Sequence, residues 1–303
     1  MLKEFYPEYS PFDKEVLIYT SEYPFQSIFS LYKVFYVYNL SSVAKMFQAL
    51  EKIKPAIVAV YPSILKDVAL KYPDKCKDLG IKVILTNSEH SAQKERDAFE
   101  KIFGCKVFDE YSSEELSSIA CQCREKKYHL APDSSYIEIM DADKDIKLKD
   151  GELGEIVGTC LINNAMPIIR YRQGDYGKIV NKKCKCARQI PILESIGGRK
   201  NSSFVSQGNK LIASGRILDW SYSLVLSLKL NVKQFQIVQE TKNKICIYLV
   251  VGKDYKIKTD NKKVIADFRK TFGESFDVKI KLTPKIQKTK AGKLLPIISR
   301  VSL

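Results

Sequence analysis

The stretch Ala165–Asp175, Ala-Met-Pro-Ile-Ile-Arg-Tyr-Arg-Gln-Gly-Asp, sets two arginines and an aspartate among apolar residues. The guanidinium groups of Arg170 and Arg172 can bind phosphate or carboxylate oxygens through paired N–H donors, and Asp175, directly after a glycine, can accept hydrogen bonds from a diol. A ligand with a polyphosphate and a ribose fits this set of groups. The alternative is a buried strand that ends in a Gly-Asp turn and carries two surface arginines. The flanking sequence favours the ligand site.

Glycine-containing segments flank this stretch on both sides. Gly151–Thr159 (Gly-Glu-Leu-Gly-Glu-Ile-Val-Gly-Thr) precedes it, and Ile196–Arg199 (Ile-Gly-Gly-Arg) follows it. The three segments together resemble the adenylate-forming superfamily, within the branch of phenylacetate-coenzyme A ligases and CapK-like proteins of capsular polysaccharide biosynthesis. The resemblance runs from about Pro55 to Lys293. It implies a partial large, nucleotide-binding lobe in residues 1–198 and a small carboxyl-terminal lobe in residues 199–303.

Composition agrees with two domains and places most of the charge in one of them. A chain of 303 residues with 45% hydrophobic content can bury a sizeable core. The net charge is +15, and residues 200–303 hold 21 Lys and Arg against 7 Asp and Glu. Such an excess suits a polyanion, such as coenzyme A phosphates, an acidic carrier protein or nucleic acid, or else it forms a solvated lysine-rich face. Because no nucleic-acid recognition motif accompanies the charge, we do not expect a nucleic-acid partner.

Apolar strands alternate with amphipathic helices over the first 108 residues. We expect strands at 15–20, 33–40, 56–61, 82–86 and 106–108, and helices at about 43–53, 63–71 and 91–103. This pattern predicts an α/β fold with a doubly wound, mostly parallel sheet, covered on both faces, that binds ligands at the carboxyl ends of its strands. Strands at 135–140, 155–161 and 168–171 predict a second, smaller β-rich subdomain. Strands at 232–239, 244–251 and 277–282 with a helix at 262–272 predict a small α+β carboxyl-terminal domain.

Two polar motifs close strands of the predicted parallel sheet, Thr86–Glu89 and Asp109–Glu115. The second resembles the superfamily's Tyr-Gly-x-x-Glu segment, which implies that Tyr111 packs on adenine and that Glu115 helps to hold the magnesium ion that accompanies ATP. Ser112 occupies the glycine position, and Glu114 is a second carboxylate that could serve the metal. The resemblance also implies that Ser88 lies near the adenine. Apart from any family, a carboxylate at a strand end beside helix-capping serines suits magnesium and phosphate, although the same residues could simply begin a helix.

Three further residues take roles from the resemblance. Tyr171–Asp175 matches the superfamily's Tyr-Arg-x-Gly-Asp, which implies that Asp175 binds the ribose hydroxyls. Arg199 matches the Gly-Arg at the joint between the lobes, which implies contact with the nucleotide, but the hinge aspartate expected there is replaced by Lys200, Asn201 and Ser202.

Lys293 is the candidate catalytic lysine. Gln287–Lys293 resembles the family's terminal Thr-x-x-Gly-Lys loop, and the lysine would be carried in by lobe rotation to stabilise charge on the α-phosphate and the attacking carboxylate. The alternative is a hairpin turn in a lysine-rich domain.

Closely spaced cysteines indicate a metal site. Cys123, His129, Cys184 and Cys186 form a Cys3His set, which suits a closed, tetrahedral, structural zinc site. Cys121 is the alternative ligand, and the other possibility is free buried cysteines with an exposed histidine. Some relatives of phenylacetate-coenzyme A ligase carry a structural zinc in this region, and here it would join the loop after Glu115 to the loop after Asp175.

The residues and the resemblance together predict an ATP-dependent ligase that converts a carboxylate and ATP to an acyl-adenylate and passes the acyl group to coenzyme A or another thiol. Nothing in residues 1–62 resembles the superfamily's Ser/Thr/Gly-rich phosphate loop. We therefore expect weak or no activity of the chain alone, and either a separate amino-terminal lobe as partner or self-association. The alternative is a non-catalytic nucleotide-binding or scaffold protein in surface polysaccharide assembly.

The chain shows no sign of export or membrane insertion. No apolar run approaches the roughly 18 residues that cross a bilayer, and the first residues lack the order of a signal peptide. Eight cysteines in a chain of this length do not suggest a secreted disulfide framework. We expect a cytoplasmic protein without a membrane partner.

Overall fold

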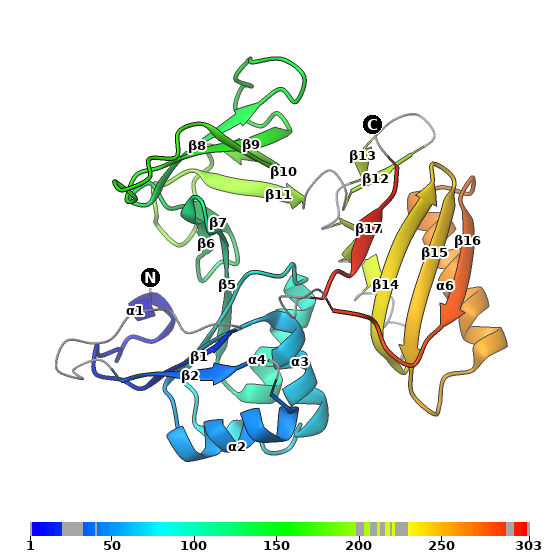
Figure 1. The fold of residues 1–303 in the computed structure, drawn as a ribbon, viewed down its shortest axis with the longest axis horizontal. Coiled ribbons are helices and arrows are strands. Elements are labelled where there is room, and N and C mark those ends of the chain that lie inside the picture. The colour runs from blue at the N-terminus through cyan, green and yellow to red at the C-terminus, as the bar shows by residue number, and fades with distance from the viewer. Residues whose placement is uncertain are drawn as a thin grey trace.

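The computed structural model describes residues 2–19, 33–39, 41–197, 203–206, 211–212, 216–218, 220–221, 230–288 and 294–301. Within these residues the chain forms an 11-stranded, a 4-stranded and a 2-stranded sheet. Figure 1 shows the helices α2, α3 and α4 beside the parallel strands, the strands β8–β11 further along the large sheet, and the carboxyl-terminal strands to one side. The mixed α/β class predicted from the sequence is confirmed.

One half of the large sheet is parallel, and crossover helices join β2 to β3, β3 to β4 and β4 to β5. The spatial order is β2-β1-β3-β4-β5, and every neighbouring pair in it is parallel. The strands are β1 (Glu15–Tyr19), β2 (Val34–Tyr38), β3 (Ile57–Val60), β4 (Val83–Thr86) and β5 (Lys106–Ser113). All four residues of β3 are buried, as expected for a central strand covered on both faces.

Three amphipathic helices cover one face of these strands: α2 (Val43–Ile53), α3 (Pro62–Lys71) and α4 (Gln93–Phe103). Helix α2 begins where Ser42 Oγ accepts the Lys45 N–H at 3.3 Å. Their apolar stripes and the strand residues that face them form one continuous core. On the opposite face, the short helix α1 (Leu2–Phe5) places Phe5 on Phe108, with the ring centroids 4.4 Å apart.

Strand β5 joins the two halves of the large sheet. It pairs with β4 as far as Asp109 and then, from Glu110, with the antiparallel strand β6 (Ser117–Gln122). The expectation that the strand ends at Phe108 is therefore wrong. The polar residues after Phe108 continue the strand because β6 supplies backbone partners for them, and no helix begins at Ser112 or Ser113.

The rest of the large sheet is antiparallel, in the order β6-β7-β11-β10-β9-β8. These strands are β7 (Tyr128–Leu130), β8 (Ser135–Met140), β9 (Gly154–Cys160), β10 (Tyr171–Val180) and β11 (Ile192–Gly197). The strand expected at 168–171 instead begins at Tyr171, after Arg170 with φ of 49°. Gly154 is required by packing, since a Cβ there would lie 2.4 Å from the Met140 carbonyl oxygen.

Residues 230–301, here called the carboxyl-terminal unit, form a sheet in the order β16-β15-β14-β17 with one long helix on it. Its elements are β14 (Val232–Thr241), β15 (Lys244–Val251), α6 (Ile257–Phe272), β16 (Asp277–Leu282) and β17 (Ile297–Ser299). Helix α6 starts earlier than expected, where Asp260 accepts the Lys256 N–H at 2.8 Å. Val264 and Phe268 form its buried face. Two short strands, β12 (Phe204–Val205) and β13 (Leu211–Ile212), lie just before this unit in the chain.

None of the helices in the described part of the chain is both long enough and apolar enough to span a bilayer.

Candidate functional site

Tyr111 on β5 and Asp175 on β10 meet across the antiparallel half of the large sheet. The Tyr111 hydroxyl donates to Asp175 Oδ2 at 2.6 Å and accepts from Gln173 Nε2 at 2.5 Å. Tyr111 and Asp175 are half-buried, and Gln173 is buried. Gly174, with φ of 84°, lets β10 bulge between Gln173 and Asp175, so that both side chains reach the same tyrosine. The sequence did not identify Gln173 as a site residue, because it stands at the x of the pattern Tyr-Arg-x-Gly-Asp, where any residue type matches.

A second carboxylate comes from the same segment as Tyr111. Glu115 follows the end of β5, and its Oε1 accepts the Tyr171 hydroxyl at 2.9 Å. Glu115 is half-buried, whereas Glu114 is exposed. The two segments that carry Tyr111 with Glu115 and Tyr171 with Asp175 are therefore joined by two tyrosine–carboxylate hydrogen bonds.

A buried polar network holds β5 in place just before Tyr111. Asp109 accepts from the Thr86 hydroxyl at 2.5 Å and from the Tyr128 hydroxyl at 2.6 Å, and the Arg96 guanidinium lies 4.0 Å away. Burial raises the pKa of Asp109, and the Arg96 charge and the two hydroxyl donors oppose that rise in part. The sequence marked Asp109 only as the start of a polar run. Its supporting role depends on residues from β4, β7 and α4, which no local pattern connects.

Ser88 lies in the loop that follows β4. Thr86 on β4 pairs with Asp109 on β5, and Ser88 and Tyr111 each come two residues after one member of this pair. Ser88 is exposed and has φ of 62°. Next to it, the Asn87 side chain hydrogen-bonds with the Tyr19 hydroxyl at 2.8 Å, which ties this loop to β1.

Arg170 and Arg172 are bound to carboxylates of the protein itself. The Arg170 guanidinium lies 3.1 Å from Glu138 and 3.4 Å from Asp145, and the Arg172 guanidinium lies 2.8 Å from Glu155. The expectation that these two arginines are arranged for a phosphate or carboxylate ligand is corrected, because acids on β8 and β9 occupy their donors. Sequence alone could not place those acids opposite the arginines.

Cys123, His129, Cys184 and Cys186 converge on one point. Their potential ligand atoms all lie within 4.8 Å of one another. Cys123 Sγ is 3.8 Å from Cys184 Sγ, and Cys186 Sγ is 3.3 Å from His129 Nε2. His129 Nδ1 lies 2.7 Å from the Ile190 carbonyl oxygen, which leaves Nε2 facing the thiols. Cys121 lies outside this cluster, with its Sγ 3.4 Å from Ser118 Oγ.

The two turns that present the cysteines have the same backbone form. The Lys126 N–H donates to the Cys123 carbonyl at 2.8 Å, and the Ala187 N–H donates to the Cys184 carbonyl at 3.1 Å. Lys126 and Ala187 have φ of 61° and 68°, so each turn ends in a left-handed residue. Glu4 joins the turns from outside, since it accepts from the Arg124 N–H and pairs with Arg188.

The remaining two candidates, Arg199 and Lys293, lie outside the residues that the structure describes. The same holds for the expected hinge residues Lys200, Asn201 and Ser202.

Comparisons with known proteins find relatives of this chain. Residues 206–300 match the family model of the CapK C-terminal domain. A phenylacetate-coenzyme A ligase of Aromatoleum evansii is 30% identical over 178 residues, which cover 55% of this chain and 39% of that protein. Protein CapK of Staphylococcus aureus is 25% identical over 247 residues, which cover 80% of this chain and 53% of that protein. These matches support the resemblance to the adenylate-forming superfamily, in its CapK and phenylacetate-coenzyme A ligase branch.

Solved structures of two CoA ligases share the fold. A 2-hydroxyisobutyryl-CoA ligase in its postadenylation state, with 2-HIB-AMP bound, superposes with a TM-score of 0.76 at 20% identity, over 96% of this chain and 66% of that chain. An anthranilate CoA ligase in complex with anthranoyl-AMP superposes with a TM-score of 0.70 at 13% identity, over 94% of this chain and 58% of that chain. The chain thus spans about two fifths to two thirds of the length of the proteins it matches.

Proposed function

We propose that this chain binds ATP or AMP at Tyr111, Glu115 and Asp175 and takes part in forming an acyl-adenylate. The observation that carries the proposal is the meeting of Tyr111 and Asp175, 64 residues apart, through a 2.6 Å hydrogen bond. An aromatic ring that can stack on a base and a carboxylate that can accept from a diol are the two groups that a nucleoside needs at one place. Ser88, Arg199 and Lys293 are further proposed members of this site.

Each proposed group has a separate task. The Tyr111 ring supplies a face for the adenine, and its hydroxyl keeps Asp175 oriented. Asp175 accepts hydrogen bonds from the ribose hydroxyls, and Glu115 offers carboxylate oxygens, the ligand type that magnesium prefers. When bound, magnesium would neutralise charge on the phosphates of ATP. Lys293 would stabilise negative charge that develops on the α-phosphate as the substrate carboxylate attacks it.

The proposed reaction has two steps. The carboxylate oxygen forms a bond to the α-phosphorus and pyrophosphate leaves, giving an acyl-adenylate. A thiol, with coenzyme A as the proposed acceptor, then forms a bond to the acyl carbon and AMP leaves. The solved 2-hydroxyisobutyryl-CoA ligase structures support this proposal, since they hold 2-HIB-AMP and, in the thioesterification state, CoA as well.

We further propose that Cys123, His129, Cys184 and Cys186 hold a structural zinc ion. Zinc–sulfur bonds of about 2.3 Å at tetrahedral angles separate two sulfurs by about 3.8 Å, and the Cys123–Cys184 separation is 3.8 Å. The Ile190 carbonyl would orient His129 as the outer partner of a metal-bound imidazole commonly does. Four protein ligands would fill the tetrahedral coordination of zinc and leave no position for a substrate. The role of the ion would therefore be to hold the loop after β6 against the loop before β11.

A second candidate is a non-catalytic nucleotide-binding or scaffold protein. It is kept because the match to protein CapK, whose name states no ligase activity, covers 80% of this chain. The two functions differ in one measurement, which is ATP–pyrophosphate exchange by the full chain with a panel of aryl and short-chain carboxylates. Exchange that is lost in Lys293→Ala supports the ligase, whereas nucleotide binding without exchange is expected both of the second candidate and of a ligase portion that needs a separate amino-terminal lobe.

A further inference from the structure

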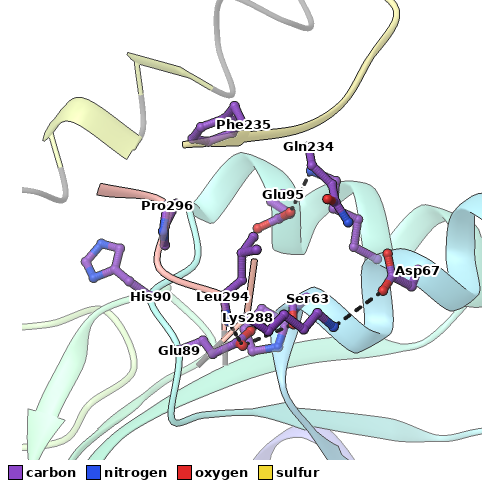
Figure 2. A pocket seen from close by; sticks show the side chains of 12 residues that line it. Ser63, Asp67, Glu89, His90, Glu95, Gln234, Phe235, Lys288, Leu294 and Pro296 are labelled. Carbon is purple, nitrogen blue, oxygen red and sulfur yellow. Dashed lines mark hydrogen bonds and ion pairs between the residues drawn. The ribbon is translucent and has the colours of Figure 1, made fainter. Parts of the chain in front are cut away.

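The carboxyl-terminal unit meets the rest of the chain at the start of helix α3. Figure 2 shows the contact, a small pocket where Ser63 and Asp67 on α3 and Glu89 in the loop after β4 face Lys288 and Leu294. Lys288 and Leu294 are the described residues on either side of residues 289–293. Among the described residues, these two flanking residues each make a polar contact to the other unit, and the Lys66 ammonium on α3 also lies 5.9 Å from the centre of the Phe235 ring.

The first contact is made by Glu89. Its Oε1 accepts the Leu294 backbone N–H at 2.9 Å and the Ser63 hydroxyl at 3.0 Å, and its Oε2 accepts the Ser63 backbone N–H at 2.9 Å. Ser63 is the second residue of α3, where a backbone N–H has no partner within the helix. Glu89 therefore caps α3 from another loop and, with the same carboxylate, holds the carboxyl-terminal unit.

The second contact is an ion pair one helical turn further along α3. Asp67 Oδ2 lies 3.7 Å from Lys288 Nζ, and both side chains are about 30% exposed. Asp67 follows Ser63 by four residues, so the two lie on the same face of α3. Helix α3 is thus linked to both sides of residues 289–293: to Leu294 through Glu89, and to Lys288 through Asp67.

Each of the two contacts can break without loss of the fold of either unit. Burial raises the pKa of Glu89, while the N–H donors of Leu294 and Ser63, the Ser63 hydroxyl and the Lys288 charge lower it in part. On separation of the two units, Glu89 would exchange one backbone donor for water and keep the Ser63 cap. A half-exposed ion pair such as Asp67–Lys288 is individually weak. The contact can therefore form and break without unfolding either unit.

We infer that Glu89 and Asp67 form a clasp, in which Glu89 binds Leu294 and Asp67 binds Lys288, that holds the carboxyl-terminal unit against α3. Glu89 is a positioning residue, because it holds the carboxyl-terminal unit in place. The inference concerns how the two units are held together and does not require ATP binding. Its catalytic consequence rests on the proposed function, because Lys293 immediately precedes Leu294 in the sequence. A rearrangement of the carboxyl-terminal unit would have to release both contacts.

The test is residue-resolved amide hydrogen exchange of the full chain without nucleotide. In Glu89→Ala, both the Leu294 and Ser63 amides should exchange faster, on the order of threefold to tenfold for loss of one hydrogen bond. Glu51→Ala, which changes an exposed acid on α2, is the matched control and should leave both rates unchanged. Faster exchange at Ser63 with unchanged exchange at Leu294 would show that Glu89 only caps α3, and would overturn the clasp.

A charge exchange covers the case in which Glu89→Ala does not fold. Lys288→Asp should speed exchange at Leu294, because it sets two acids against each other across the contact. The double variant Asp67→Lys with Lys288→Asp should restore the wild-type rate. Equal rates in the wild type and Lys288→Asp, or no recovery in the double variant, would contradict the role of Asp67. Because these rates are measured without ATP, failure of the clasp and failure of the proposed nucleotide site remain distinguishable.

Discussion

The Tyr111 hydroxyl donates a 2.6 Å hydrogen bond to Asp175, and this bond ties strand β5 to strand β10. The two groups proposed to bind the base and the sugar of one nucleotide thus also fix each other. Stacking would use the ring face of Tyr111 and not its hydroxyl, so the bond is compatible with a base stacked on the ring. A site prearranged in this way loses less freedom when the ligand binds.

The first prediction separates the two uses of Tyr111. Tyr111→Phe keeps the ring and should retain most of the AMP affinity, whereas Tyr111→Ala should lose about 1–3 kcal/mol, the usual contribution of an aromatic ring stacked on a base. Isothermal titration calorimetry measures both. Equal affinities in the two variants would mean that the ring does not contact the base.

The second prediction concerns metal content. The purified chain should carry about one zinc ion, by analogy with other closed Cys3His sites, and Cys184→Ser/Cys186→Ser should lose it. Cys121→Ser is the control, because Cys121 lies close in sequence to Cys123 but outside the cluster. Native mass spectrometry gives the metal count. Full zinc retention in the double variant, or zinc loss in the control, would be incompatible with the four proposed ligands.

The third prediction is a pH dependence of stability that comes from Asp109. Burial raises its pKa, so the folded chain binds this proton more tightly than the unfolded chain does. The contribution of Asp109 to the free energy of unfolding should be greatest below its usual pKa of about 4 and should decline as pH rises through the raised value.

Asp109→Asn removes this titration and keeps one side-chain oxygen, which can accept from only one of the Thr86 and Tyr128 hydroxyls. Urea unfolding between about pH 4 and pH 8 should therefore show a smaller decline in stability for the variant than for the wild type. Asp145→Asn, a change at a largely exposed acid, is the control and should follow the wild type. Parallel curves for Asp109→Asn and the wild type would show that Asp109 has the same pKa in both states.

The parallel strands and their helices could be predicted because each is a strong local signal. A buried run such as β3 and an apolar stripe such as that of α2 are visible in the sequence itself. The extension of β5 could not be predicted in this way. Residues Glu110–Ser113 are polar and read as a loop, and their strand conformation depends on pairing with β6, which is a tertiary contact.

For the site, the family resemblance named residues that the fold then brings together, including Tyr111 with Asp175. What it could not supply are the groups that support them from elsewhere in the chain. Gln173 and Asp109 act through contacts that exist only after folding. The arginines show the opposite case: Arg170 and Arg172 looked available for a ligand, but Glu138 and Glu155 bind them once β8 and β9 lie beside β10.

The central claim is that an adenine nucleotide binds between β5 and β10, and calorimetric titration of the full chain with AMP and with ATP and magnesium tests it most directly. The account predicts that the wild type binds and that Asp175→Ala loses about 1–3 kcal/mol of binding free energy, since a charged acceptor for the ribose is removed. Asp145→Ala, at an acid that binds Arg170 instead, should bind as the wild type does. Absence of nucleotide binding by the wild type, or equal binding by Asp175→Ala, would contradict the claim.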